Sequence, residues 1–158
     1  MTARQLRDVT DADLDALADL FRRASLSNPG SRDVLRAHPE VLELDREALR
    51  AGRTRVLWQG EQIAGYARTV VDGEAAELED LFVDPDRHRQ GLGRVLVDDA
   101  VAIARAARAD RLEVTGNPDA LEFYRAVGFA ETGPIDTPLG LPAVRLSRPL
   151  RIVPISPP

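Results

Sequence analysis

The stretch at residues 84–100, DPDRHRQGLGRVLVDDA, leads from a proline turn through two closely spaced glycines into an amphipathic run. Apolar residues recur at spacings of three and four from Leu92 onward, with Arg94 and Asp98 between them, which predicts a helix packed by one face on a sheet. A helix N-terminus offers unpaired N–H groups and a positive dipole end, and glycines let a ligand approach the backbone. The stretch therefore predicts either a phosphate-binding loop or a tight strand-to-helix turn without a ligand.

Strand patterns lie on both sides of this predicted helix. The Asp72-Gly73 pair is a hairpin signal inside a predicted antiparallel meander. A strand at 111–116 after the helix completes a crossover, so it should run parallel to 77–83 and beside it. The result is a mixed α/β sheet. The other predicted elements are strands at 4–9, 53–59, 62–71 and 143–150, a helix at 10–24, two short helices in 32–52 and a helix at 117–129.

Charge and composition narrow the function classes. The 21 basic residues are all arginine, and 26 Asp and Glu residues leave a formal net charge of −5. This acidic balance argues against nucleic acid as a partner, because such binding needs a basic face, and favours a cationic small molecule or peptide. The lack of lysine and cysteine excludes Schiff-base, cysteinyl and thiolate-metal chemistry.

The length and the chain ends suggest a simple organisation. A chain of 158 residues predicts one domain, at 1–150, followed by a proline-rich tail at 151–158. No apolar run approaches the roughly 18 residues that cross a bilayer, and the first residues lack the apolar core of a signal peptide. We therefore expect a cytoplasmic protein with no membrane partner.

Two common phosphate-binding motifs do not fit the glycine stretch. A P-loop requires Gly-Lys followed by Ser or Thr, and the sequence has no lysine. The dinucleotide fingerprint requires a third glycine where Leu96 stands. If the loop holds a phosphate, it does so in another way.

Residues 88–93 resemble the acetyl-CoA loop of the GNAT superfamily, the general N-acetyltransferases. That pattern is Arg or Gln, two residues, Gly, one residue, then Gly or Ala. Gly91 and Gly93 match it, whereas His88 departs from it at the first position. In the family this loop acts mainly through backbone amides, so the departure concerns only the usual side-chain contact.

Two further segments carry the resemblance. ELEDLFVDP, at 77–85, resembles the family's fourth strand, and Asn-x-x-Ala-x-x-Phe-Tyr-x-x-x-Gly-Phe, at 117–129, resembles its second conserved block. The likeness covers 53–130, and the first 50 residues fit only as the variable substrate-facing helices. It implies the acyl-CoA N-acyltransferase fold of the α/β (α+β) class: a single mixed, mostly antiparallel sheet of about seven strands with a parallel central pair and helices on both faces.

The resemblance implies acetyl-CoA as cosubstrate, with its pantetheine arm between splayed fourth and fifth strands. The thioester carbonyl would lie near the Val83 amide, which could stabilise an oxyanion. Asn117 would either bond the pantetheine or cap the following helix. The acids around His88 belong to a proline turn, which is usually solvated, so no metal is expected. The predicted cofactor-binding residues are Leu81, Phe82, Val83, His88, Arg89, Gln90, Gly91, Leu92, Gly93, Arg94, Asn117, Ala120 and Tyr124.

An amine acceptor must lose a proton before it attacks. For an alkylamine with a pKa near 10.4 this costs about 4.6 kcal/mol at pH 7, so a carboxylate base is useful. Glu79 is the favoured base or ammonium anchor, with Asp80 second and Glu77 third; the alternative is a solvated strand face without a role. The period of two places Glu77 and Glu79 on one face and Asp80 on the other, unless a family bulge shifts the register.

Tyr124 is the predicted general acid. In the family, a tyrosine at this place in the Phe-Tyr pair protonates the leaving thiolate, and a phenol of pKa near 10 suits a thiolate of pKa near 8.5. The alternative is an aromatic side chain that only packs. Phe123 is expected in the core.

These residues predict an acetyl-CoA-dependent N-acetyltransferase that transfers acetyl directly to an amine of a small molecule or peptide. Two alternatives stay open: a non-catalytic acetyl-CoA-binding regulatory module, and a peptide N-terminal or lysine acetyltransferase. Dimers are common among similar proteins, so a homodimer is compatible with the resemblance, but the residues do not decide it.

Overall fold

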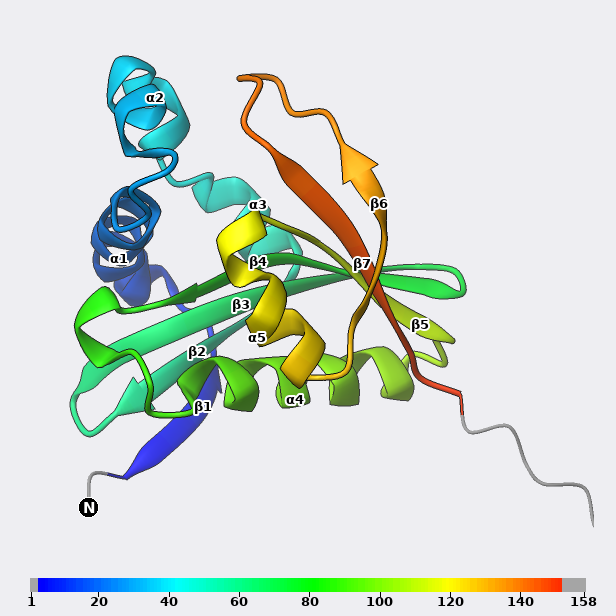
Figure 1. The fold of residues 1–158 in the computed structure, drawn as a ribbon. Coiled ribbons are helices and arrows are strands. Elements are labelled where there is room, and N and C mark those ends of the chain that lie inside the picture. The colour runs from blue at the N-terminus through cyan, green and yellow to red at the C-terminus, as the bar shows by residue number, and fades with distance from the viewer. Residues whose placement is uncertain (1–2, 152–158) are drawn as a thin grey trace, which may run out of the picture.

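The computed structural model describes residues 3–151, and the predicted tail beyond Arg151 lies outside the described residues. All the strands belong to one seven-stranded sheet with the order β1-β2-β3-β4-β5-β7-β6 (Figure 1). This confirms the predicted mixed sheet. The strands are β1 (Arg4–Asp8), β2 (Arg53–Gln59), β3 (Gln62–Asp72), β4 (Ala75–Val83), β5 (Arg111–Gly116), β6 (Ala130–Ile135) and β7 (Ala143–Pro149).

The order of the strands follows from their connections. The first four strands pair antiparallel. Short turns join β2 to β3 and β3 to β4, as the hairpin signals predicted, whereas residues 9–52 connect β1 to β2. β4 and β5 are the parallel pair, joined by the crossover helix. β6 was not predicted as an individual strand, because Gly133 and Pro134 interrupt its sequence. Its place at the edge explains why a strand with proline forms there, since an edge strand needs only one partner.

Helices cover both faces of the sheet, as expected. α4 lies along one face, and α1 to α3 lie on the other (Figure 1). Pro39 begins a short 3-10 turn between α2 and α3, which agrees with the two short helices predicted there. The helices are α1 (Leu14–Leu26), α2 (Arg32–Ala37), α3 (Arg46–Ala51), α4 (Leu92–Ala106) and α5 (Leu121–Ala126).

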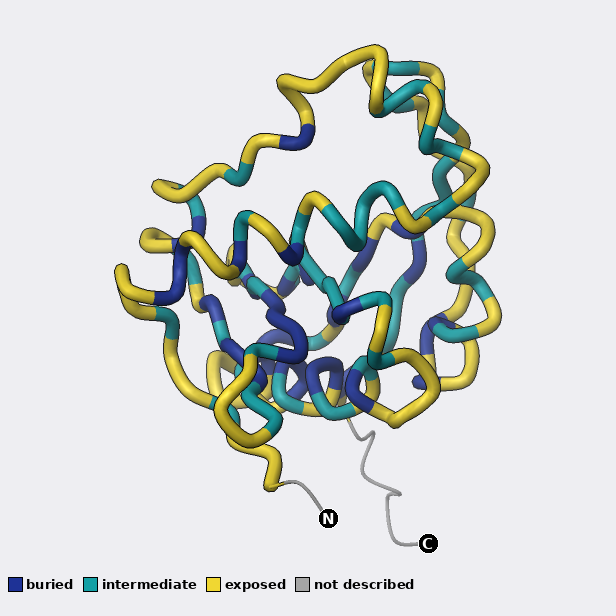
Figure 2. The backbone as a smooth tube through the Cα atoms, turned by 90° about the vertical axis from the view of Figure 1, so that its left-hand side faces the viewer, coloured by how far each residue is buried: buried dark blue, intermediate teal, exposed yellow. Residues whose placement is uncertain are grey.

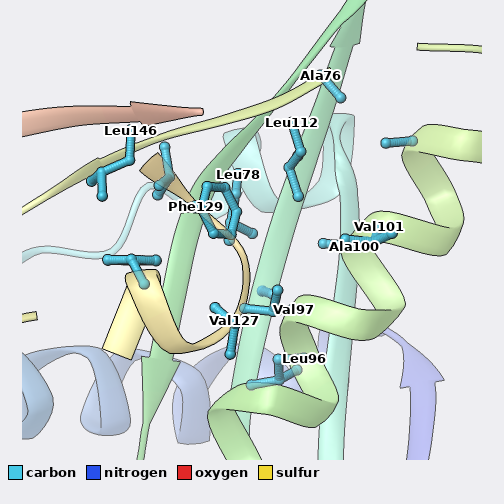
Figure 3. Packing of buried hydrophobic residues seen from close by; sticks show 14 of the residues in the cluster. Ala76, Leu78, Leu96, Val97, Ala100, Val101, Leu112, Val127, Phe129 and Leu146 are labelled. Carbon is cyan, nitrogen blue, oxygen red and sulfur yellow. The ribbon is translucent and has the colours of Figure 1, made fainter. Parts of the chain in front are cut away.

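The larger hydrophobic cluster lies between α4 and the sheet. Leu96, Val97 and Ala100 of α4 are at most 1% exposed and pack toward Leu78 and Leu112 of the central strands (Figure 3). Buried positions gather on the inner sides of the elements, and exposed positions follow their outer sides (Figure 2). Because apolar burial is the main favourable term in folding, this cluster fixes the start of α4 against the end of β4.

The smaller cluster lies under α1 and contains a buried hydroxyl without a partner. Tyr66 is 0% exposed, its ring stacks on Phe82 with 5.5 Å between centroids, and its hydroxyl has no hydrogen-bond partner in the part of the chain that the structure describes. Burial raises the pKa of this hydroxyl well above its usual value, and the nearby Asp80 adds to the effect.

Tyr66→Phe should therefore stabilise the protein. Removing an unsatisfied buried hydroxyl recovers its desolvation cost, about 1 kcal/mol or more. The folded state also holds the phenol proton that the unfolded chain loses above pH ~10. Above this pH the wild-type protein therefore loses stability through Tyr66 at about 1.4 kcal/mol per pH unit, and the variant does not. Urea unfolding at pH 7 and above pH 10 measures both effects. A less stable variant at pH 7 would contradict the expectation.

Candidate active site

The site begins where β4 and β5 separate. Their pairing extends only to Leu78 opposite Val114; β4 continues to Val83, while β5 remains paired with β7. The Asp84 N–H donates to the Ala64 carbonyl on β3 over 2.8 Å. Because successive N–H groups of a strand point to opposite edges, the Val83 N–H is directed away from β3, toward the open side of β4.

A β-bulge in β4 changes the predicted arrangement of the carboxylates. Arg68 of β3 pairs with Asp80, but the next residue pairs with Leu78, so Glu79 is the extra residue. The bulge reverses the alternation beyond it. Without the bulge Glu77 and Glu79 would share one face and Asp80 would lie on the other. The alternative that the sequence left open, a bulge that shifts the register, is the one found, and Asp80 lies on the face of Glu77. Three side chains of β4 lie on the face opposite α4. Glu77 meets Arg145 there, Asp80 meets Arg68, and Phe82 meets Tyr66.

Two of the three candidate carboxylates are held in ion pairs. Arg145 of β7 donates to Glu77 over 2.9 Å and also bonds Glu113 of β5. The Arg68 Nε donates to Asp80 over 2.8 Å. Glu79 is exposed and has no ion-pair partner among residues 3–151. Glu79 is therefore the carboxylate that is free to accept a proton, although none of the three lines a described cavity.

The loop before α4 presents its backbone toward the same region. Gly91 is the N-cap residue with φ +76°, and no side chain caps the helix. Its positive φ explains the need for glycine, and Arg89 also has a positive φ, of 64°. The first N–H groups of a helix have no intrahelical partner, so those of Leu92, Gly93 and Arg94 are available to an anion.

The preceding proline turn is fixed by a buried acid. Asp84 is 8% exposed and accepts hydrogen bonds from Arg23 over 2.9 Å and from the Asp86 N–H over 2.9 Å. Burial opposes ionisation of Asp84, but these bonds outweigh it and hold the pKa below its usual value. The described residues contain no group of three or more His, Cys, Asp or Glu that could hold a metal ion.

A cleft of about 650 Å³ joins the open edge of β4, the start of α4 and α5. Among the predicted cofactor residues, Phe82 and Gln90 do not line it: Phe82 packs against Tyr66 and Phe21, and Gln90 is held by Arg4 and Gln59. The predicted residues that do line the cleft are Leu81, Val83, His88, Arg89, Gly91, Leu92, Gly93, Arg94, Asn117, Ala120 and Tyr124; those not predicted are Ser27, Asn28, Pro29, Arg87, Asp119, Phe123, Ala126 and Val127.

Asn117 acts as a cap. Its Oδ1 accepts the Ala120 N–H over 3.0 Å, which supports one of the two predicted roles. It also lines the cleft, so its amide NH₂ remains able to donate to a ligand.

Gly116 of β5 leaves room for the Tyr124 ring, because it has no side chain. A Cβ atom at Gly116 would lie 2.8 Å from Tyr124 Cε2, and one at Gly93 would lie 3.0 Å from Phe123 Cε1. The two glycines thus let both aromatic rings of α5 pack closely against β5 and α4. Tyr124 is 6% exposed, and this burial raises its pKa to about 12. Its hydroxyl therefore stays protonated throughout the neutral range.

The family model described as Acetyltransferase (GNAT) family matches residues 14–129. The chain belongs to the GNAT family. The match includes α1 and α4, the glycine loop and Tyr124, so it extends over the whole cleft.

This GNAT chain has relatives in sequence and in structure. It is 30% identical to serotonin N-acetyltransferase 2 of Oryza sativa subsp. japonica over 127 residues, which are 78% of this chain and 60% of that protein. It spans 60% or less of the length of the first curated relatives that it matches.

Solved structures show the same fold over nearly the whole chain. A GCN5-related N-acetyltransferase from Rhodopseudomonas palustris superposes with a TM-score of 0.78 at 21% identity, covering 95% of this chain and 98% of that one. PaiA N-acetyltransferase of Thermoplasma acidophilum, solved in complex with coenzyme A, superposes with a TM-score of 0.74 at 14% identity, covering 93% of this chain and 99% of that one.

Among residues 3–151, none of the helices combines the length and the apolar character that a membrane span needs.

Proposed function

We propose that the protein is an acetyl-CoA-dependent N-acetyltransferase that transfers acetyl directly to an amine of a small molecule or peptide. The observation that carries this proposal is the single cleft shared by Val83, the uncapped start of α4 at Gly91 and the buried Tyr124. Membership of the GNAT family supports it, and so do the relative named as a serotonin N-acetyltransferase and the neighbour solved with coenzyme A.

The residues of the cleft suit coenzyme A. The free N–H groups at the start of α4 would hold its diphosphate, and Arg89 and Arg94 add positive charge beside them. The unpaired edge of β4 offers the backbone groups of Leu81 and Val83 to the pantetheine amides. When bound, acetyl-CoA supplies a thioester whose acetyl group passes to the amine and whose sulfur leaves as a thiolate.

The chain's own groups would assist both bond changes. The amine nitrogen bonds the acetyl carbon while the carbon–sulfur bond breaks, and the Val83 N–H donates to the carbonyl oxygen as it gains charge. Tyr124 gives its proton to the departing sulfur. Glu79, directly or through a water, takes the proton that the amine loses, because Arg145 and Arg68 occupy the two neighbouring carboxylates.

The test is release of CoA thiol from acetyl-CoA in the presence of amines, amino acids, polyamines and short peptides. If thiol release depends on an acceptor and its rate falls about tenfold in Glu79→Gln, the result supports both the proposed activity and the role of Glu79 as the base. If acetyl-CoA raises the melting temperature but no acceptor is acetylated, the non-catalytic binding module replaces the enzyme. The engagement of Glu77 and Asp80 in ion pairs is the observation that favours this alternative.

Gly91→Val should weaken acetyl-CoA binding. A β-branched residue strains at a φ of +76°, at a cost of about 1–3 kcal/mol, and relief of this strain would turn the loop amides away from the diphosphate. We expect the Kd for acetyl-CoA in calorimetry to rise about tenfold. Gly73→Val is the matched control: Gly73 has a φ of +62° and equally open surroundings, but lies in the β3–β4 turn, so only stability should fall. Equal Kd changes in both variants would contradict the proposal.

The cytoplasmic location and the lack of a nucleic-acid partner remain predictions, and a homodimer remains compatible with the family resemblance.

A further inference from the structure

A smaller cavity of about 310 Å³ adjoins the cleft. It lies between the end of α1, the start of α2 and the open end of β4, and it shares Leu81, Val83, His88, Asn117 and Asn28 with the cleft. A molecule in it would therefore reach the Val83 end of the cleft, where the proposed reaction takes place.

The lining of this cavity contains no Asp, Glu or Arg, although 30% of the chain is charged. Arg32, the residue after Ser31 of the lining, is held away by hydrogen bonds to the carbonyls of Leu26 over 2.7 Å and Ser27 over 3.4 Å. The lining consists of apolar Ala24, Leu35, Leu81, Phe82 and Val83 and of polar Ser25, Asn28, Ser31, His88 and Asn117.

Two polar groups of the lining are amides whose acceptor oxygens are already in use. The Oδ1 atom of Asn28 already accepts the Gly30 N–H over 3.0 Å, and that of Asn117 accepts the Ala120 N–H, so both amides keep their NH₂ groups for a ligand. Phe82 adds an aromatic surface, which Phe21 supports edge-on with 5.0 Å between centroids. Such a cavity suits an apolar body with at most one or two neutral acceptor groups.

We infer that the acceptor is a primary monoamine whose body is uncharged and largely apolar. This inference rests on the proposed function. A second ammonium group would enter the cavity without a carboxylate to pair with, and a free carboxylate would find no guanidinium there. Either group would therefore lose part of its hydration without gaining an ion pair with Asp, Glu or Arg. The reacting amine must lose its proton in any case, and the same desolvation favours its neutral, nucleophilic form.

A matched pair of acceptors tests the inference. Pentylamine and cadaverine have the same five-carbon chain and differ in a second amine. With saturating acetyl-CoA at pH 8, we expect kcat/KM for pentylamine to exceed that for cadaverine, and that for a lysine-containing peptide, by about tenfold or more. 2-Phenylethylamine should react at least as well as pentylamine, because its ring can pack on Phe82.

A charge introduced into the cavity should reverse the preference. Ser31 is the N-cap of α2, a position where aspartate is favoured, so Ser31→Asp should fold normally and give the second ammonium a partner. We expect the pentylamine-to-cadaverine ratio to fall about tenfold. Ala37→Asp places the same charge at the exposed end of α2, outside the cavity, and should leave the ratio unchanged.

The outcomes separate the inference from the function on which it rests. Acetylation that favours cadaverine or the peptide in the wild-type protein overturns the acceptor class and leaves the N-acetyltransferase intact. A ratio that Ser31→Asp and Ala37→Asp change equally overturns the assignment of this cavity. The absence of turnover with every amine overturns the proposed function, and the acceptor class with it.

Discussion

Tyr124→Phe is expected to lower kcat about 100-fold, within the range typical of general acids, while the Kd for acetyl-CoA stays nearly constant. The variant keeps the ring that packs against Gly116 and Phe129 and removes only the hydroxyl. The departing thiolate then lacks the proton that the Tyr124 hydroxyl would supply. Steady-state thiol release together with calorimetry separates the two quantities.

The pH profile gives a second readout for Tyr124. Burial raises its pKa to about 12, so the Tyr124 hydroxyl stays protonated over the pH range in which the amine acceptor loses its proton. The wild-type rate should therefore rise with pH and show no descending limb near pH 10, where an ordinary tyrosine would ionise. If Tyr124→Phe retains more than about a third of the wild-type kcat, Tyr124 has only a packing role.

Gly116→Ala should lower kcat about tenfold without touching a reacting group. Its Cβ would lie 2.8 Å from Tyr124 Cε2, so the ring must move, and a displacement of less than 1 Å at a catalytic group can cost this much. The crowding should also lower the free energy of unfolding by about 1–3 kcal/mol. Thiol release at a temperature well below the measured Tm separates the loss of rate from the loss of fold.

The double variant Gly116→Ala/Tyr124→Phe distinguishes positioning from a general structural effect. If Gly116 acts by placing the Tyr124 hydroxyl, the double variant should be as slow as Tyr124→Phe alone, because the hydroxyl that Gly116 places is already gone. Losses that multiply would show that Gly116 acts independently of that hydroxyl.

Local features allowed much of the fold to be predicted. The glycine loop, the apolar period of α4 and the Asp72-Gly73 turn act between residues that are close in sequence, so their geometry follows from backbone freedom and side-chain spacing. The crossover from β4 to β5 followed because parallel neighbours need one. β6 was not predicted, since its edge pairing with β7 compensates for an unfavourable sequence.

The candidate site could be predicted only in part. The resemblance indicated Tyr124 and the α4 loop, and both line the cleft. The roles of the carboxylates depended on partners distant in sequence, such as Arg145 for Glu77, and on a bulge that no local pattern marks. Asn28 of the α1–α2 connection reaches the cleft only because α1 packs over Phe82.

The sequence by itself determined the family resemblance, the order of the helices and of every strand except β6, and the groups able to perform acyl transfer. The tertiary structure decided which of these groups remain free. Whether a carboxylate is a base or an ion-pair partner, and whether a cavity is charged or neutral, depends on which side chains meet across strands and helices. Periodicity along one strand cannot encode such contacts, because they arise only when the whole sheet has formed.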